Sequence, residues 1–432
     1  MKIAIIGYGL QGASSYKYWR KDNQITICDQ NEIKDPPKDV ELRIGEDHLN
    51  NLQDFDLIVR SPSVHPRDII SANGEQIKDK ITTNTNEFFK VCPSKNIIGV
   101  TGTKGKGTTS SLITKMLEAE GKKVHLGGNI GTPPLEMLEH GINESDYVVL
   151  ELANFQLIDL KYSPHIAVCL MVVPEHQDWH EDMEEYVTAK KQLFIHQTPS
   201  DIAIYYSDNE ISEDIASSGK GVKIPYFENP GANINNELVV IDGQTICRTD
   251  EVKLLGRHNL QNICAAVTAT WQIDQNTEAI KQVTASFTGL EHRLELVREL
   301  NGVKYYDDSF ATTPESAIVA IEAFKDPKVI ILGGSDKVAE YIQLAKTVAG
   351  GNVKHAVLIG DTAKSIEQAL KNEGFSDYSF GSKDINEIVG LCKEKSSPGD
   401  VVLLSTGCAS FGIFKDYKDR GEKFKKAVQE LA

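Results

Sequence analysis

A glycine- and lysine-rich stretch, residues 101–109 (TGTKGKGTT), has the residue types of a phosphate-binding site. The apolar, β-branched run 97–100 before it predicts a strand, and the residues after it predict a helix over 108–118. Glycines let backbone N–H groups close around anionic oxygens, and the helix N-terminus adds the positive end of its dipole. Lys106 is therefore expected to contact the β- and γ-phosphates of a nucleotide.

The spacing of this loop differs from the common pattern G-x-x-x-x-G-K-[ST]. Gly107 stands where a hydroxyl residue normally follows the lysine, so the shorter form G-x-x-G-K-x-[ST] fits instead. A plain surface turn is disfavoured, because strand, loop and helix follow one another in the order that a phosphate site needs. Thr108 or Thr109 is the candidate hydroxyl ligand of Mg²⁺. The predicted nucleotide-binding residues are Gly102, Thr103, Lys104, Gly105, Lys106, Gly107, Thr108 and Thr109.

Two later apolar runs end in side chains that can bind a metal ion. Glu151 follows the apolar run VVL, and His176 comes shortly after the run IAVCLMVV. In a parallel sheet the carboxyl ends of the strands face the ligand crevice, so Glu151 is expected beside the phosphate loop, where a carboxylate can hold Mg²⁺. By itself, a histidine after a strand is more often structural than a ligand. The paired Lys190 and Lys191, in the helical pattern 184–196, are by themselves typical of a solvated face.

The beginning of the chain contains a second glycine-rich turn. The apolar run 2–6 predicts a strand, which leads into Gly7-x-Gly9-x-x-Gly12, and Asp29 ends the next predicted strand. This arrangement is the dinucleotide fingerprint, although the pattern alone is a weak indication. NAD or FAD is one interpretation. Another nucleotide-like ligand, docked at the same helix N-terminus, is the favoured one.

Length and composition restrict the class of protein. A chain of 432 residues with 40% hydrophobic and 25% charged residues is expected to form two or three globular domains. The net charge of −16 argues against a nucleic-acid or anionic-membrane surface. The seven cysteines include no C-x-x-C pair and are typical of a reducing compartment. Without a signal-peptide pattern or an apolar run of membrane-spanning length, the protein is expected to be cytoplasmic, with no membrane insertion.

Strands alternate with helices throughout the chain, which predicts an α/β protein with mostly parallel sheets. We expect three domains. They are a Rossmann-like substrate-binding domain over 1–92, a central ATP-binding domain with the parallel sheet of a phosphate-loop ATPase over 93–290, and a Rossmann-like amino-acid-binding domain over 291–432.

Taken together, these segments resemble the Mur ligases, the ATP-dependent amino-acid ligases of peptidoglycan precursor synthesis. The resemblance extends from about Gly7 to Phe424, and its last motif resembles the glutamate-adding branch. The motifs are GTKGK (102–106), GGNIG (127–131), ELANFQL (151–157), His176 with Asp178, GRHN (256–259), His292-Arg293, Asp308-Ser309, and LSTGCASF (404–411) with Phe414-Lys415-Asp416-Tyr417 and Arg420-Gly421.

The resemblance implies a two-step ligase reaction. ATP phosphorylates the terminal carboxylate of UDP-N-acetylmuramoyl-L-alanine, and the amine of glutamate then displaces the phosphate. D-glutamate is favoured and L-glutamate is the alternative. The implied cofactors are ATP and Mg²⁺ at two sites, and the implied state is a monomer with no nucleic-acid partner.

The resemblance also implies roles for individual residues. Lys106 matches the γ-phosphate lysine, Glu151 and His176 match Mg²⁺ ligands, and Lys190, four residues after Tyr186, matches a lysine that is carbamylated to support the metal. The register excludes Lys191 from that role. The implied ATP contacts outside the loop are Asn259, Asn262, Arg293 and Asp308. The implied contacts to the UDP substrate are Gly9, Leu10, Gln11, Asp29, Asn129 and Gln156. The implied contacts to glutamate are Thr312, Lys337, Ser410, Phe411 and Tyr417.

Three departures from the family keep alternatives open. Phe310 stands where the family often has a lysine, and Ala153-Asn154 stands where it usually has a serine pair. The insertion of Gly107 before the threonines resembles the phosphate loop of folylpolyglutamate synthase. That related enzyme lacks the α/β unit before the phosphate loop. A nicotinamide-dependent oxidoreductase would leave the loop, Glu151 and His176 without a role, and a regulatory nucleotide-binding protein would not need the lysines and metal ligands.

Overall fold

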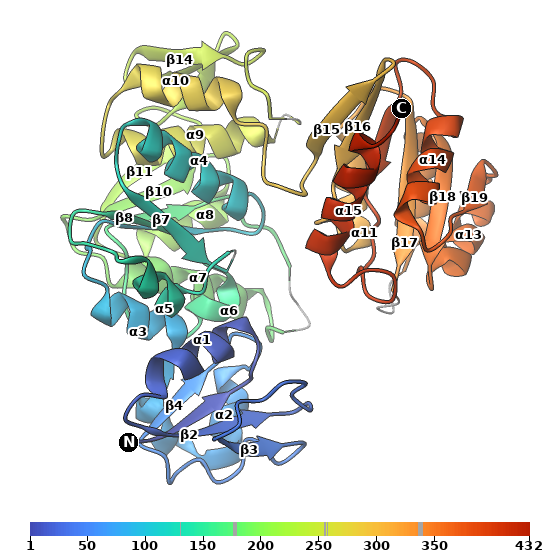
Figure 1. Ribbon diagram of the computed structural model, residues 1–432. Coiled ribbons are helices and arrows are strands. Elements are labelled where there is room, and N and C mark those ends of the chain that lie inside the picture. Colours follow the sequence, from blue (N-terminus) through green and yellow to red (C-terminus); the bar gives the residue numbers. More distant parts are fainter. Residues whose placement is uncertain (130, 176–178, 255, 257, 336–339) are drawn as a thin grey trace. The chain divides into compact units, whose positions relative to one another are not determined.

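The computed structural model describes residues 1–129, 131–175, 179–254, 256, 258–335 and 340–432. The chain forms two compact units (Figure 1). Unit 1 comprises residues 1–253 and 257–287, and unit 2 comprises residues 254–256 and 288–432. Strands alternate with helices in both units, and the sheets are mostly parallel, which confirms the predicted α/β class.

The first sheet of unit 1 is parallel and has the strand order β3-β2-β1-β4-β5. The run 2–6 forms β1 as predicted, whereas β3 and β5 were not predicted. β3 contains only two apolar residues and lies at the sheet edge, so its sequence carries little strand signal. The strands are β1 (Lys2–Ile6), β2 (Gln24–Asp29), β3 (Glu41–Ile44), β4 (Leu57–Arg60) and β5 (Ile81–Thr83), and the helices are α1 (Leu10–Trp19), α2 (Pro66–Asn73), η1 (Glu75–Lys80) and α3 (Asn84–Val91).

The second sheet is also parallel, with the order β11-β10-β9-β6-β8-β7. β6 lies between β8 and β9, so the phosphate loop after β6 and Glu151 at the end of β8 emerge at the same edge. The strand predicted over 166–173 ends at Cys169. The strands are β6 (Ile97–Thr101), β7 (Val124–Gly128), β8 (Tyr147–Glu151), β9 (Ile166–Cys169), β10 (Ile202–Tyr206) and β11 (Val222–Tyr226).

Helices and a small antiparallel sheet complete unit 1. The predicted helices over 108–118 and 184–196 occupy Lys106–Ala119 (α4) and Met183–Ile195 (α7). The remaining helices are α5 (Pro134–Met137), η2 (Leu138–His140), α6 (Asn154–Leu157), α8 (Glu210–Ser217), α9 (Asn259–Trp271) and α10 (Thr277–Ser286). The antiparallel strands β12 (Asn233–Asn235), β13 (Leu238–Ile241) and β14 (Gln244–Arg248) were not predicted.

Unit 2 contains one sheet with the order β15-β16-β20-β17-β18-β19, parallel except for the β15–β16 hairpin. Its strands are β15 (Glu295–Leu300), β16 (Val303–Asp307), β17 (Lys328–Gly334), β18 (Val353–Gly360), β19 (Tyr378–Phe380) and β20 (Val401–Leu404). Its helices are α11 (Pro314–Glu322), α12 (Ile342–Gly350), α13 (Ala363–Asn372), α14 (Ile385–Lys395) and α15 (Tyr417–Gln429). The predicted domain boundaries at residues 92 and 290 stay predictions, because the first two sheets belong to one compact unit.

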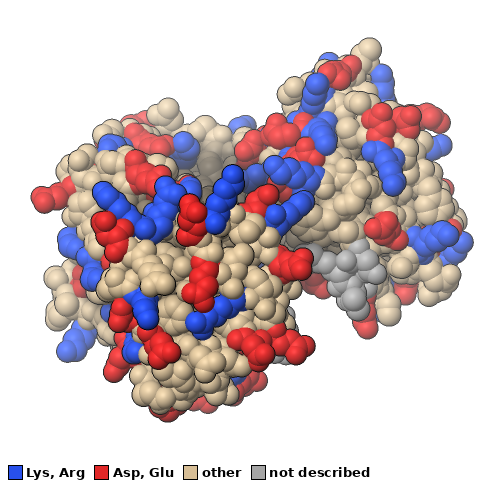
Figure 2. Space-filling view, turned by 60° about the horizontal axis from the view of Figure 1, so that its bottom comes forward, with Lys and Arg blue, Asp and Glu red and all other residues tan. Residues whose placement is uncertain are grey.

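The surface carries both signs of charge. On the face shown in Figure 2, basic and acidic side chains are interspersed. Within the described ranges, every helix falls short of the length or the apolar character that crossing a bilayer requires.

A buried ion pair joins the first sheet to the central one. Arg60, the last residue of β4, has a side chain with 0% exposure, and its Nε and Nη2 donate to Asp159 at 2.9 and 2.6 Å. The same guanidinium donates to the carbonyls of Val64 at 2.8 Å and Phe155 at 3.0 Å. A buried guanidinium is tolerated only when it is paired and hydrogen-bonded in this way.

Replacing Arg60 by methionine is expected to lower the stability of unit 1 by about 3 kcal/mol, because removing one partner of a buried pair leaves its acceptors unsatisfied. Urea denaturation followed by circular dichroism measures the effect. The control is Arg248→Met, which removes an exposed arginine paired with Asp250 and is expected to leave the denaturation midpoint nearly unchanged. Equal denaturation midpoints for the two variants would contradict the prediction.

Candidate functional site

The phosphate loop has a backbone that only glycine accommodates at two positions. Gly102 has φ 144° and Gly105 has φ 90°. A Cβ atom on Gly102 would lie 2.6 Å from the Leu170 side chain, and one on Gly105 would overlap the side-chain oxygen of Asn262. Gly105 is the N-cap of α4 and makes no side-chain cap hydrogen bond, and a helix N-terminus of this kind favours a nearby anion.

Two lysines converge on the carbonyl oxygen of Gly102. Lys106 donates to it at 3.1 Å and to the Thr103 carbonyl at 2.9 Å. Lys190, on α7, donates to the same Gly102 oxygen at 3.1 Å. The structure thus places two ammonium groups at the loop that was predicted to bind phosphate.

Lys190, rather than Lys191, faces the loop. Lys190 is 1% exposed, and its Nζ lies 4.3 Å from the ring centroid of Tyr186. Burial, helped by the nearby Lys106, lowers the pKa of Lys190 to about 7. Lys191 instead points away and pairs with Asp214 at 2.9 Å. Near pH 7, a substantial fraction of Lys190 is therefore a neutral amine.

Glu151 lies beside the loop, as its position at the end of β8 predicts. Its carboxylate is buried, and Oε1 accepts a hydrogen bond from Asn129 Nδ2 at 3.0 Å. β8 pairs with β6, with Glu151 opposite Val100. A buried carboxylate and the hydroxyl of Thr108 at the start of α4 are oxygen donors of the kind that Mg²⁺ binds. The other predicted ligand, His176, and its neighbour Asp178 lie outside the described residues.

Asn259 and Asn262 also lie beside the loop. Both are on the first turn of α9, and Asn262 Nδ2 donates to Asn259 Oδ1 at 2.7 Å. Asn262 Oδ1 is close to Gly105 and accepts from Thr109 Oγ1 at 3.5 Å. The structure therefore brings these two residues, more than 150 positions later in the chain, to the loop.

The remaining loop and substrate-path residues have distinct positions. Lys104 is exposed, whereas Gly107 is buried in α4. Thr103 Oγ1 is 2.9 Å from the Tyr186 hydroxyl, which ties the loop to α7. Gln156, on α6, is buried, and its Oε1 accepts from the Ala153 N–H at 3.0 Å.

The glycine fingerprint forms a strand–turn–helix in the first sheet. Gly7 has φ 82°, and a Cβ on Gly12 would overlap the Gly7 carbonyl, so both glycines are required. Asp29 Oδ2 accepts from the Tyr8 N–H at 2.7 Å, which shows that this carboxylate also holds the turn together. Gly9 is the N-cap of α1. The next two residues are Leu10, which is 80% exposed, and Gln11.

Unit 2 contains Arg293 and Asp308 near one another. Asp308 is buried, and its carboxylate accepts from Ser405 Oγ at 2.6 Å and from the Leu294 N–H at 3.2 Å. Burial raises the pKa of Asp308 to about 7. The guanidinium of Arg293 lies 5.8 Å from the ring centroid of Phe310.

The predicted glutamate residues lie after strands β16 and β20 of unit 2. Thr312 follows β16, Ser410 is buried after β20, and Phe411 is 57% exposed. Tyr417 begins α15, and its ring lies 5.2 Å from that of Phe310. Lys337 lies outside the described residues.

Arg420 holds two segments near the predicted glutamate residues together. Its motif was noted in the sequence, but no role was predicted for it. Its guanidinium is fully buried and donates to Ser309 Oγ at 2.9 Å, the Ser309 carbonyl at 2.8 Å and the Cys408 carbonyl at 3.1 Å. Burial lowers its pKa to about 10. Arg420 thus fixes the segment after β20 against the segment after β16.

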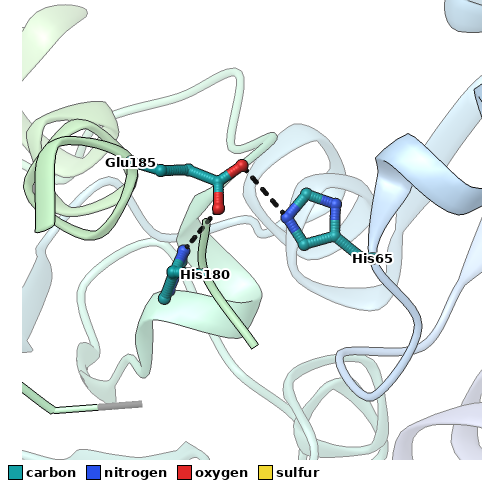
Figure 3. Close-up of side chains that lie close together, drawn as sticks. All are labelled: His65, His180 and Glu185. Atoms are coloured by element: carbon teal, nitrogen blue, oxygen red, sulfur yellow. Dashed lines mark hydrogen bonds and ion pairs between the residues drawn. The ribbon is translucent and has the colours of Figure 1, made fainter. Parts of the chain in front are cut away.

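A cluster of His65, His180 and Glu185 was also not predicted (Figure 3). Its potential ligand atoms lie within 4.8 Å of one another, which is compatible with a metal ion. The position of the proton on the His65 ring argues against a metal ion here. His65 Nδ1 accepts from the Arg67 N–H at 3.1 Å, so its Nε2, which faces Glu185, carries the proton. A metal-binding imidazole needs the opposite arrangement.

Family models match two parts of the chain. The Mur ligase middle domain matches residues 100–270, and the Mur ligase, glutamate ligase domain matches residues 292–408. The UDP-N-acetylmuramoylalanine–D-glutamate ligase of Clostridium kluyveri is 38% identical over 93% of this chain and 88% of that protein. The enzyme of the same name from Clostridium tetani is 36% identical over 100% of this chain and 97% of that protein.

Solved structures share the fold. UDP-N-acetylmuramate-alanine ligase from Thermotoga maritima has a TM-score of 0.61 at 16% identity, covering 99% of both chains. The MurF ligase of Thermotoga maritima, in complex with ADP, has a TM-score of 0.60 at 18% identity, covering 100% of this chain and 95% of that chain.

Replacing Lys106 by alanine is expected to weaken ADP binding about ten- to a hundredfold, because a hydrogen bond to a charged group contributes about 1.5–3 kcal/mol. Isothermal titration calorimetry measures the affinity. The matched control is Lys115→Ala, which removes an exposed lysine from the same helix, where it pairs with Glu118. If both variants bind ADP equally well, Lys106 does not contact the β-phosphate.

Proposed function

Because the chain belongs to the Mur ligase family, we propose that it joins D-glutamate to UDP-N-acetylmuramoyl-L-alanine at the expense of ATP. The relatives at 36–38% identity bear the name of this activity and are covered almost completely. The alternative interpretation of the glycine fingerprint, as part of a nicotinamide-dependent oxidoreductase, is therefore wrong. The observation that carries the proposal is the convergence of Lys106 and Lys190 on a glycine loop at the N-terminus of α4, beside the buried Glu151.

In the proposed reaction, the terminal carboxylate of UDP-N-acetylmuramoyl-L-alanine takes the γ-phosphoryl group of ATP and ADP leaves. The glutamate amine then attacks the acyl phosphate, an amide bond forms, and inorganic phosphate and a proton are released. Negative charge is concentrated on the transferring phosphoryl group, so cations and backbone N–H groups fixed in advance stabilise the transition state. Lys106 and the N-terminus of α4 supply them here.

Metal binding in this proposal depends on oxygen donors from unit 1. Glu151, Thr108, His176 and a carbamate formed on Lys190 would hold Mg²⁺, with two sites as the prediction. The ion, when bound, supplies additional positive charge to the phosphate oxygens. The buried carboxylate of Glu151 fits this role.

The remaining predicted residues are assigned to substrate contacts. We propose a substrate domain over 1–92, an ATP domain over 93–290 and a glutamate domain over 291–432, in a monomer located in the cytoplasm, where ATP is supplied. The UDP substrate would contact Gly9, Leu10, Gln11, Asp29, Asn129 and Gln156. ATP would contact the loop together with Asn259, Asn262, Arg293 and Asp308, and glutamate would contact Thr312, Lys337, Ser410, Phe411 and Tyr417.

With UDP-N-acetylmuramoyl-L-alanine and ATP, kcat/KM for D-glutamate is expected to exceed that for L-glutamate by about 10⁴-fold. A pocket that hydrogen-bonds one isomer leaves buried polar groups unpaired with the other. Phosphate release gives the rates, and folate with L-glutamate tests the folylpolyglutamate synthase alternative. Lys337→Ala is expected to raise KM for glutamate. Equal rates for the two isomers would argue against the proposed D-specific pocket.

Lys190 is expected to become carbamylated, because CO₂ adds to a neutral amine and the pKa of Lys190 is lowered to about 7. The neutral fraction rises with pH through this value, so carbamylation should increase from pH 6 to pH 8. ¹³C-NMR of protein in ¹³C-bicarbonate detects the carbamate. Lys190→Ala should lose both the signal and turnover, with partial rescue of turnover by short-chain carboxylates. Lys191→Ala is the control and should retain both.

A further inference from the structure

The carboxylate of Glu185 connects three segments of unit 1. Glu185 is on the first turn of α7, and Figure 3 shows His180 and His65 directed toward its two oxygens. Oε2 lies 3.1 Å from His180 Nδ1 and 2.9 Å from the Glu181 backbone nitrogen, and Oε1 lies 3.3 Å from His65 Nε2. His65 belongs to the part of unit 1 that contains the first sheet, whereas His180 and Glu185 belong to the central part.

His65 links Glu185 to the glycine turn of the first sheet. It follows β4 as the N-cap of α2. Its Nε2, which carries the proton of the neutral ring, lies close to Glu185 but is not aligned for a hydrogen bond. In the same segment, Ser61 Oγ donates to the Gly7 carbonyl at 2.6 Å. The segment 61–65 therefore runs from the turn proposed to bind the UDP moiety to Glu185 on α7.

His180 links Glu185 to α6. Its Nδ1 donates to Glu185, and its Nε2 is the acceptor for Asn154 Nδ2 at 2.6 Å. The side chain is 1% exposed and is enclosed by aromatic rings, with Trp179 at 4.7 Å and Tyr186 at 5.4 Å between centroids. Trp179 also lies 4.4 Å from the His65 ring, so it packs between the two histidines.

From Glu185, α7 continues to the phosphate loop. The next residue, Tyr186, contacts Thr103 through its hydroxyl at 2.9 Å, and Lys190 one turn later contacts Gly102 at 3.1 Å. A shift of α7 against the first sheet would move both contacts. Glu185 is the group on α7 that reaches the first sheet through His65.

The electrostatics of this cluster match two neutral imidazoles and one carboxylate. Burial lowers the pKa of both His65 and His180 despite the neighbouring carboxylate. Burial alone would raise the pKa of Glu185, but the Glu181 N–H, His180 and the charged Arg67 outweigh it and leave the pKa lowered. Arg67 also pairs with Glu181 at the rim of the cluster. The ionised Glu185 thus accepts hydrogen bonds from His180 and the Glu181 N–H through one oxygen and faces His65 and Arg67 electrostatically through the other.

We propose that Glu185 is a positioning residue that keeps the glycine turn of the first sheet in register with the phosphate loop. This inference rests on the proposed ligase function, since register matters only if one substrate spans the two sites. Glu185 touches neither the nucleotide loop nor the glycine turn. Its removal should therefore leave each half-site able to bind its own ligand while slowing the reaction that needs both.

The first experiment separates binding from turnover in the full-length protein. Glu185→Ala is expected to bind UDP alone and ADP alone with affinities within about twofold of the parent, measured by calorimetry. Its kcat with the complete substrates should fall about 10- to 100-fold, because misplacement of reacting groups by about 1 Å costs up to that much. The kcat of Glu185→Gln should lie between those of the parent and Glu185→Ala, since the amide oxygen can still accept from His180 but the negative charge that faces His65 and Arg67 is lost.

The matched control is Glu184→Ala, which removes an exposed carboxylate from the same turn and should behave as the parent does. A Glu185→Ala protein that loses UDP or ADP affinity, or that retains the parent's kcat, overturns the proposal. If the parent itself releases no phosphate with any glutamate isomer, the proposed function fails instead, and the two failures are distinguishable.

A double-mutant cycle tests the link to the first sheet. His65→Asn retains a side-chain oxygen that can cap α2 but cannot reach Glu185. It should lower kcat on its own, and combining it with Glu185→Ala should give no further loss, because both changes break the same connection. Losses in kcat that multiply would show that the two residues act separately and would overturn the proposal.

Discussion

Two lysine ammonium groups share one carbonyl oxygen at the start of the phosphate loop, and the organisation of unit 1 follows from holding them there. Lys106 reaches the Gly102 oxygen from α4, and Lys190 reaches it from α7. Burial and the proximity of like charges make this arrangement unfavourable for Lys190, whose pKa falls to about 7. A nucleotide phosphate, or a carboxylate built on Lys190, would offset both costs. The geometry is therefore better suited to an anionic ligand than to the stability of the protein alone.

Polar contacts, as well as apolar packing, hold the surrounding elements at fixed positions. Arg60 joins the first sheet to the segment after α6, and Glu185 joins it to α7. Buried charges contribute little net stability, because desolvation opposes their attraction, but leaving one partner unpaired is costly. Such contacts penalise alternative alignments of the two sheets. Apolar surfaces tolerate small displacements more easily, so we assign the register of the two half-sites to these polar groups.

The sequence was informative where function depends on local spacing. It predicted the strand, glycine turn and helix around Lys106 and the position of Glu151 at a strand end, whereas the choice of Lys190 over Lys191 came from the family resemblance. It did not predict the short edge strand β3, whose residues carry a weak pattern, or the antiparallel strands β12–β14, although the apolar run of β13 and the Asp242-Gly243 turn after it form a hairpin pattern. Partners such as Arg60 and Asp159 are 99 positions apart, and no local signal pairs them. In the cluster around Glu185, His180 is close to Glu185 in sequence, but His65 is distant and no local signal pairs it with them.

Phe310 illustrates how a departure in sequence is accommodated in unit 2. The resemblance to the Mur ligases leads one to expect a lysine there, and the aromatic ring cannot replace its charge. Instead, the ring lies 5.8 Å from the Arg293 guanidinium and edge-on to Tyr417. A cation over an aromatic face gains about 0.5–1 kcal/mol at exposed sites, which is enough to favour one orientation of a flexible arginine. Phe310 therefore orients a neighbouring charge where the lysine would supply one. An arginine offers several donors in a fixed plane, so its orientation decides which phosphate oxygens it can reach.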